Sequence, residues 1–330
     1  MLARAMKATG RSLLSSAGRA GVRVGSLITP QQTARYVARR FFTTDRAPAD
    51  RRRFVAEPPR VLTMPLADGP VVTYAWGDTV RSPTVLLVHG WNGWAQQLER
   101  FVEPLRAQGF AVLAFDHIAH GESRGEQATL PMMIRTVEAL LDELQQPAGV
   151  IGHSLGAAAA AAVLANAPGT VPAAVLVSPP TDPRPFLRWV ARALGAPDDL
   201  LDEVQREAEA HAGVPMAELA TDEAFVRRIA TPLLVVHDTK DAEVPITNGY
   251  VYAKAPNARM LVTDGLGHNR ILRDLHVIDA SVRFIAEQRA SSPVHAVIPT
   301  HAAAPMAMAP MRKAEVREHR DMLTDVGAMA

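Results

Sequence analysis

Three short polar segments of this chain each carry a residue type that works in nucleophilic catalysis. The segment 152–156 (GHSLG) contains Ser154, the segment 265–269 (GLGHN) contains His268, and the segment 238–245 (DTKDAEVP) contains carboxylates. A serine hydroxyl becomes a nucleophile at neutral pH when an imidazole accepts its proton, and a carboxylate then orients the imidazole. These residue types therefore predict a Ser–His–Asp triad.

The residues around Ser154 favour a nucleophile over a small polar residue in an ordinary turn. An apolar run that reads as a buried strand precedes Ser154, and a block of alanines with helical character follows it. A strand-to-helix turn of this kind holds its serine in a strained backbone, and Gly152 and Gly156 keep Cβ atoms out of the crowded flanks. We therefore predict that Ser154 is the nucleophile and that the alanines let the helix approach the sheet.

His268 is the best-placed base among the eleven histidines. It follows the last predicted strand, in a loop whose glycines allow the ring to reach Ser154. His153 adjoins Ser154, but adjacent side chains of a strand point to opposite faces. His237 lies inside a predicted buried strand, which is typical of a core histidine.

The position of the acid stays open between two aspartates of the segment 238–245. Asp238 falls at the tip of a predicted strand and Asp241 falls on the loop, while Glu243 is a weaker candidate. The loop position favours Asp241, because a loop residue can reach across to the neighbouring loop.

Two backbone N–H groups are expected to bind the oxyanion of a tetrahedral intermediate. One belongs to Leu155, directly after the nucleophile. The other belongs to Trp91 in the segment 89–93 (HGWNG), where Gly90 permits a sharp turn.

The elements that must position these groups follow from the alternation of apolar runs. Six runs predict buried strands over 84–90, 110–117, 148–154, 173–179, 231–238 and 258–265, and two more strands over 60–66 and 71–76 flank a tight turn. Helical patterns separate them, including 94–109, 130–147, 155–169 and 275–288. Strands that alternate with helices predict an α/β fold with a mostly parallel, eight-stranded sheet covered on both faces. Such sheets carry active groups at the carboxyl ends of their strands.

The segment 181–230 interrupts this alternation with its own helical patterns. An insertion of this length predicts a helical cap over the strand ends, and an ordinary insertion packed on the domain is the alternative. The segment carries the apolar Phe186, Trp189 and Val190, which together with Trp94 are our candidates for a substrate pocket.

Both ends of the chain differ in composition from the predicted core, which we place at 58–180 and 231–290. The segment 1–57 is a basic arm, because residues 1–44 contain eight Lys and Arg and no acid. A helix is expected over 30–42, and the arm fits a transit peptide, a membrane-surface helix or a segment packed on the domain. The segment 291–330 is rich in Ala, Pro and Met, which predicts a mostly disordered tail with a short helix near 312–322.

Composition narrows the remaining possibilities. The 330 residues include 35 basic and 34 acidic side chains, a balance that argues against nucleic acid as a partner. No stretch has the ~20 consecutive apolar residues that span a bilayer. We expect a cytoplasmic protein, with membrane association through the arm as a second possibility, and we expect no cofactor and no metal.

These motifs together resemble the α/β-hydrolase superfamily. The segments HGWNG, GHSLG, DTKDAEVP and GLGHN occur in the order that the superfamily uses for oxyanion loop, nucleophile, acid and histidine. The segment 116–123 (DHIAHGES) is similar to a structural turn of the family that contains an aspartate and a histidine. The resemblance covers about residues 58–290. It implies that the acid is Asp241, four residues before Pro245, and that a cap occupies 181–230.

The resemblance implies a serine esterase or lipase that forms an acyl-enzyme and acts on a small ester, with an apolar acyl group favoured by the candidate pocket. A thioesterase or an acyltransferase would use the same triad, and peroxidases of this fold also have a serine. A binding protein without catalysis on this fold is the remaining alternative.

Overall fold

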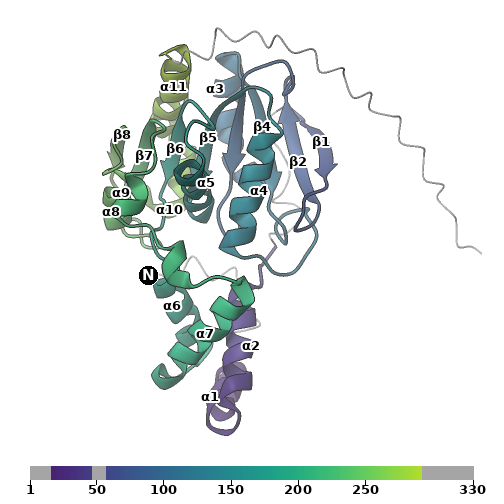
Figure 1. Ribbon diagram of the computed structural model, residues 1–330, viewed down its shortest axis with the longest axis vertical. Helices are drawn as coiled ribbons and strands as arrows, with labels where there is room; N and C mark the ends of the chain where they lie inside the picture. The colour runs from purple at the N-terminus through teal and green to yellow at the C-terminus, as the bar shows by residue number, and fades with distance from the viewer. Residues whose placement is uncertain (1–15, 47–56, 292–330) are drawn as a thin grey trace, which may run out of the picture. The chain divides into compact units, whose positions relative to one another are not determined.

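The computed structural model describes residues 16–46 and 57–291 (Figure 1). In these residues eight strands form one sheet in the order β1-β2-β4-β3-β5-β6-β7-β8. Strand β2 pairs antiparallel with β1 and β4, and the other pairs are parallel. The predicted α/β fold with a mostly parallel eight-stranded sheet is therefore confirmed. The strands are β1 Arg60–Met64, β2 Val71–Trp76, β3 Thr84–Val88, β4 Ala111–Asp116, β5 Pro147–His153, β6 Ala174–Val177, β7 Leu233–Asp238 and β8 Ala258–Thr263.

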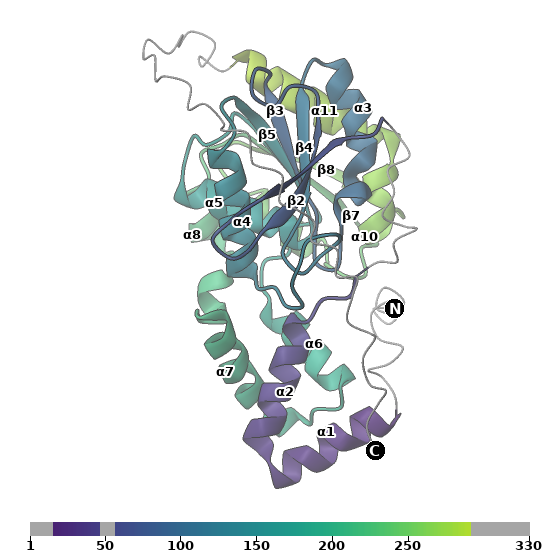
Figure 2. The same cartoon turned by 90° about the vertical axis from the view of Figure 1, so that its right-hand side faces the viewer.

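The inner strands are buried on both faces, as their continuous apolar runs require. Every residue of β3, β4, β6 and β7 is buried, whereas β1 at one edge is largely exposed and β8 at the other edge is partly exposed. Helices α4 Leu130–Asp142, α5 Leu155–Asn166, α8 Glu223–Val226 and α9 Thr247–Tyr252 pack on one face. Helices α3 Val102–Ala107 and α11 Leu275–Ser291 cover the other face (Figure 2).

One predicted helix is divided in the structure. Instead of a single helix over 94–109, a 3-10 segment covers Ala95–Phe101 and α3 follows it. Pro104 explains the break, because a proline has no N–H to donate to the carbonyl of Arg100 and its ring crowds that carbonyl. Within the segment 181–230, a 3-10 turn at Asp198–Leu200 likewise precedes α7 Leu201–Ala212.

Two N-terminal helices pack against helices of the 181–230 insertion. Helices α1 Ser16–Ile28 and α2 Pro30–Phe42 share a buried apolar cluster with α6 Arg184–Ala193 and α7. Arg35 of α2 donates to both carboxylate oxygens of Glu207 on α7, over 3.0 and 3.3 Å, and the rings of Phe42 and His211 stack at 4.8 Å. Helix α2 covers the residues over which the sequence predicts a helix. The predicted C-terminal tail, from residue 292 on, and its short helix lie outside the described residues.

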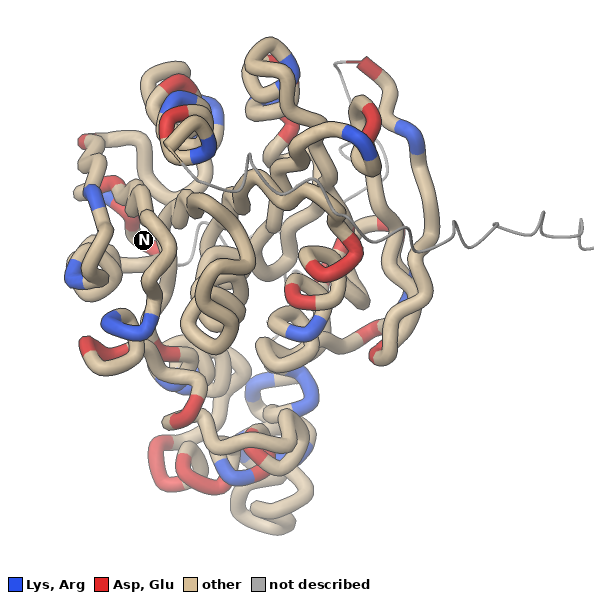
Figure 3. The backbone as a smooth tube through the Cα atoms, turned by 45° about the horizontal axis from the view of Figure 1, so that its top comes forward, with Lys and Arg blue, Asp and Glu red and all other residues tan. Residues whose placement is uncertain are grey.

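The described surface is mixed in charge. In the view of Figure 3, Lys and Arg lie among Asp and Glu along the helices and loops of the backbone. Within residues 16–46 and 57–291, no helix has both the length and the hydropathy that crossing a membrane requires.

Candidate active site

Ser154 occupies a strained turn between β5 and α5. Its backbone has φ 53° and ψ −127°, a conformation that non-glycine residues rarely adopt, and its N–H donates to the carbonyl of Val177 over 2.9 Å. A Cβ on Gly156 would lie 2.2 Å from the carbonyl oxygen of His89, and a Cβ on Gly152 would lie 2.7 Å from the Cα of Ala157. Glycine is therefore required at both flanks of the serine.

The alanines of α5 place this helix directly on the sheet. Ala157, Ala159, Ala160 and Ala161 have no exposed surface, and they belong to the cluster that joins α5 to the strands beneath it. Small side chains allow this close approach. Ser154 directly precedes α5. The N–H groups in the first turn of this helix have no intrahelical acceptors and therefore begin next to the serine.

His268 pairs with Asp241. The imidazole Nδ1 lies 2.7 Å from the carboxylate Oδ2, and both side chains are buried. The other oxygen, Oδ1, accepts the backbone N–H groups of Glu243 and Val244 over 2.9 Å each. Burial favours the neutral acid, but the bonds from His268 and the two amides outweigh it and lower the pKa of Asp241. The group is therefore a carboxylate that contacts Nδ1 of the imidazole and leaves Nε2 outside this contact.

Asp238, the other candidate acid, has different partners. It accepts hydrogen bonds from the Thr263 hydroxyl at 2.7 Å and from the Leu266 and Lys240 amides at 2.9 Å each. Burial acts to raise the pKa of Asp238, but these bonds dominate and bring it to about 2. Asp238 thus fastens the loop that leads to His268, and it makes no contact with the imidazole.

Two histidines that the sequence does not assign to catalysis support the same loops. His153, next to the serine, places its Nε2 2.9 Å from the carbonyl oxygen of His268, and the two rings lie 4.7 Å apart. His237 places its Nε2 2.9 Å from the carbonyl oxygen of Val244 and 3.7 Å from Oδ2 of Asp241. The backbone that carries Ser154 is therefore tied to the backbone that carries His268. In the sequence, the only indication that His153 belongs to the site is its position next to Ser154.

The segment 89–93 lies against the serine. A Cβ on Gly90 would come within 2.8 Å of the Cβ of Ser154, and the amide of Gly93 closes a tight turn on the carbonyl of Gly90 at 3.0 Å. Asn92 has φ 53° in this turn. Trp91 therefore lies in a turn that touches Ser154, and Leu155 is the first residue of α5. These are the positions from which the two predicted N–H donors would act.

The turn at 116–123 supports that loop. Buried Asp116 accepts from the Tyr74 hydroxyl and from the amides of Ala95 and Glu122, each at 2.8 Å. The buried ring of His120 meets the ring of Trp91 edge-on at 5.2 Å. The turn therefore braces the segment that contains Trp91.

Three of the residues predicted to form a substrate pocket contact one another or the N-terminal helices. Phe186 lies 5.7 Å from Phe41 of α2 and stacks on Trp189 at 6.1 Å, and Val190 packs against the cluster shared by α1, α2, α6 and α7. Trp94 is partly buried at the start of the 3-10 segment.

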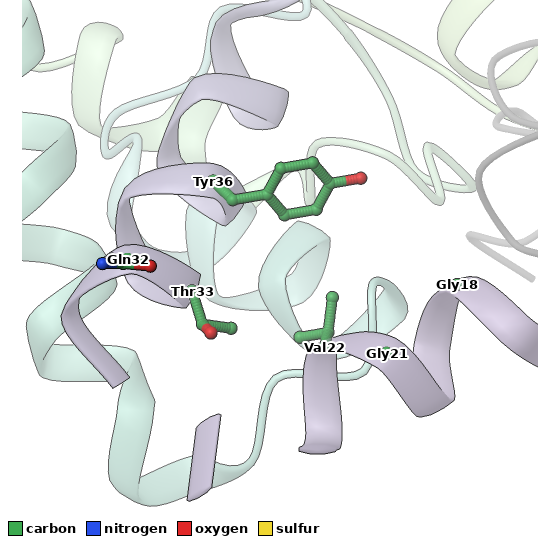
Figure 4. A pocket seen from close by; sticks show the side chains of 6 residues that line it. All are labelled: Gly18, Gly21, Val22, Gln32, Thr33 and Tyr36. Carbon is green, nitrogen blue, oxygen red and sulfur yellow. The ribbon is translucent and has the colours of Figure 1, made fainter. Parts of the chain in front are cut away.

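A hollow of about 330 Å³ lies between α1 and α2 (Figure 4). It is lined by Gly18, Gly21, Val22, Gln32, Thr33 and Tyr36, and none of the predicted pocket residues lines it.

Comparison with known proteins agrees with this arrangement. Residues 81–239 match the family of serine aminopeptidases S33. A monoacylglycerol lipase of Mycolicibacterium smegmatis is 30% identical over 206 residues, which are 51% of this chain and 74% of that protein. Human monoglyceride lipase is 29% identical over 123 residues, 34% of this chain and 41% of that protein. An esterase of Pyrococcus furiosus has the same fold, with 22% identity and a TM-score of 0.52 over 74% of this chain and 98% of that chain.

The fold and the sequence relatives define one class of protein, a hydrolase built on an α/β sheet. The chain belongs to the α/β-hydrolase superfamily, and it is a serine hydrolase that acts on esters.

Proposed function

We propose that the chain hydrolyses carboxylic esters through an acyl-enzyme, with Ser154 as nucleophile, His268 as base and Asp241 as the residue that orients His268. The observation that carries this proposal is the buried 2.7 Å contact between His268 Nδ1 and Asp241 Oδ2, on a loop joined through His153 to the strained serine.

Each step uses a group of the chain. The Ser154 hydroxyl attacks the ester carbonyl while Nε2 of His268 accepts its proton, and the N–H groups of Trp91 and Leu155 stabilise the oxyanion. Nε2 then gives the proton to the leaving alcohol as the carbon–oxygen bond breaks. A water molecule, deprotonated by the same nitrogen, attacks the acyl-enzyme. The bond between the acyl carbon and the Ser154 oxygen then breaks, the acid is released, and Nε2 returns its proton to Ser154. The strained backbone of Ser154 holds the hydroxyl at the start of α5.

The substrate is a small lipid-like ester with an apolar acyl group. Two relatives that match this chain are named for monoacylglycerol or monoglyceride, which supports a monoacyl ester of glycerol. Trp91, in the turn that touches Ser154, is the apolar side chain proposed for the acyl side, and the pocket roles of Trp94, Phe186, Trp189 and Val190 stay predictions. The helices of 181–230 act as a cap, which extends onto α1 and α2 through their shared cluster.

A peripheral contact with anionic membranes accompanies this function. The corner between α1 and α2 exposes Leu27 by 86%, Ile28 by 72% and Val24 by 55%. The exposed Arg19 and Arg23 lie on α1, the helix that carries these three side chains. Apolar side chains flanked by cations are suited to the interface of an anionic bilayer.

Replacement of the nucleophile tests the proposal. We expect Ser154→Ala to lower kcat for p-nitrophenyl butyrate and for 1-monobutyrylglycerol by roughly five or more orders of magnitude, with the circular dichroism spectrum unchanged. A fluorophosphonate probe should label the wild-type protein at Ser154. Full activity of the variant would contradict the assignment of the nucleophile. No labelling of the folded wild-type protein would favour a binding protein.

A thioesterase or acyltransferase activity would use the same groups. Butyryl thioesters and alcohol acceptors assayed beside the oxygen ester distinguish these reactions. Faster turnover of the thioester than of the oxygen ester would identify a thioesterase. Transfer of the acyl group to an alcohol in place of water would identify an acyltransferase.

A further inference from the structure

The alcohol side of the ester must lie beside His268, if the proposed mechanism holds. The general acid Nε2 protonates the leaving oxygen, so that oxygen lies within about 2.6–3.2 Å of Nε2 at that step. Any group one or two carbons away from the leaving oxygen therefore meets whatever surrounds Nε2.

Glu243 is the charged side chain on that side of the imidazole. Its Oε2 lies 3.9 Å from Nε2, and its side chain is 32% exposed. This distance is too long for a hydrogen bond between the two. Asp241 already holds Nδ1 at 2.7 Å, so Glu243 is not the residue that orients the ring.

The carboxylate of Glu243 is held in place. Oε1 accepts the side-chain amide of Asn269 over 3.1 Å, and the backbone N–H of Glu243 donates to Oδ1 of Asp241 over 2.9 Å. Asn269 follows His268 directly in the chain. Glu243 is therefore linked to the catalytic pair at two points, through Asn269 next to His268 and through Oδ1 of Asp241. A fixed acceptor costs less entropy on binding than a mobile one.

We propose that Glu243 forms the alcohol subsite of the enzyme and selects leaving groups that donate hydrogen bonds, namely polyols such as glycerol. The hydroxyl on the second carbon of the alcohol, one carbon beyond the carbon that bears the leaving oxygen, would donate to Oε2 while Nε2 faces the ester oxygen. Half-burial strengthens such a bond relative to water, because a carboxylate is a strong acceptor in a low dielectric. This proposal rests on the proposed function and extends it to the alcohol half of the substrate.

Two esters with the same acyl chain provide the test. 1-Monobutyrylglycerol and propyl butyrate differ by the two hydroxyls of the alcohol, so the ratio of their kcat/KM values reports the subsite alone. We expect Glu243→Ala to reduce the preference for the glyceryl ester about tenfold, the size of one hydrogen bond to a charged group. Glu243→Gln retains an acceptor oxygen and should keep most of the preference.

Glu287→Ala is the matched control. Glu287 is exposed on α11 and lies 3.7 Å from Arg259, which belongs to the amino half of β8, whereas His268 follows the carboxyl end of that strand. The Glu287→Ala variant should have the same ratio of kcat/KM values for the two esters as the wild-type protein. An unchanged ratio in Glu243→Ala, with both esters affected equally or not at all, overturns the subsite. Wild-type protein that cleaves neither ester overturns the proposed function itself.

Discussion

Asp238 and Asp241 lie three positions apart and serve different atoms. Asp241 contacts Nδ1 of His268, whereas Asp238 binds Thr263 and Leu266 on the loop before it. The loop position favours Asp241 from the sequence, but its contact with Nδ1 depends on how the loop turns, which the sequence does not show. The strained strand-to-helix turn at Ser154 was readable from the sequence, because strand, glycines and small-residue helix adjoin it along the chain. The support from His153 depends on a contact across 115 residues, which local patterns do not encode.

Substitution of the two aspartates by asparagine should separate their roles. We expect Asp241→Asn to lower kcat for p-nitrophenyl butyrate by roughly three to four orders of magnitude, because the imidazole loses its orientation and its cation loses a partner. Asp238→Asn should lower kcat by less than about a hundredfold, through looser placement of the loop. Steady-state kinetics on both variants decide the matter, and the reverse ranking would transfer the role of the acid to Asp238.

The elements that carry the site were mostly predictable, and those beyond it less so. The buried strands follow from continuous apolar runs, whereas α9, a short helix with a glycine and β-branched residues, has no clear signal. Helix α1 is rich in glycine, and one of its glycines explains how it packs. A Cβ on Gly25 would lie 2.6 Å from Oγ1 of Thr33, so glycine lets α1 and α2 approach closely. That contact is tertiary and outweighs weak helix propensity.

The corner between α1 and α2 provides a test of membrane contact. We expect the double change Leu27→Asp and Ile28→Asp to weaken binding to vesicles of phosphatidylcholine with 30% phosphatidylglycerol by at least about tenfold, because burial of each apolar side chain contributes roughly 1.5–3 kcal/mol. Vesicle sedimentation measures the effect.

Val61→Asp is the control for this measurement, because Val61 is 55% exposed on the edge strand β1. It should bind as the wild-type protein does. Equal binding of the double variant and the wild-type protein would remove the corner from the proposal.

At the scale of the whole described chain, several buried histidines make stability depend on pH. Burial is the main cause that lowers the pKa of His89 to about 4 and of His120 and His153 to about 3, and it lowers the pKa of His117 well below its usual range. The unfolded chain titrates near 6.5, so below that pH it binds more protons than the folded chain does. Stability is therefore full above about pH 6.5 and is lost as the pH falls toward the folded-state values.

The expected loss is about 1.4 kcal/mol for each of these histidines by pH 5.5. Urea unfolding followed by fluorescence should give a clearly lower midpoint at pH 5.5 than at pH 7.5. Replacement of His120 by Gln should reduce the difference between the two midpoints, whatever it does to the absolute stability. Identical midpoints at both pH values would contradict the argument.

The shared cluster of α1, α2, α6 and α7 has a consequence for synthesis of the protein on the ribosome. Helix α2 ends at Phe42 and its partner α7 ends at Ala212, so roughly 170 further residues must be translated before the cluster can close. At about 5–20 residues per second, the apolar face of α2 waits about ten to thirty seconds for its partner. During that interval the nascent N-terminus exposes Val37 and Phe42, which are buried in the finished protein. Helices α1 and α2 are thus translated well before their partners, and a chaperone that shields them would raise the yield of folded enzyme.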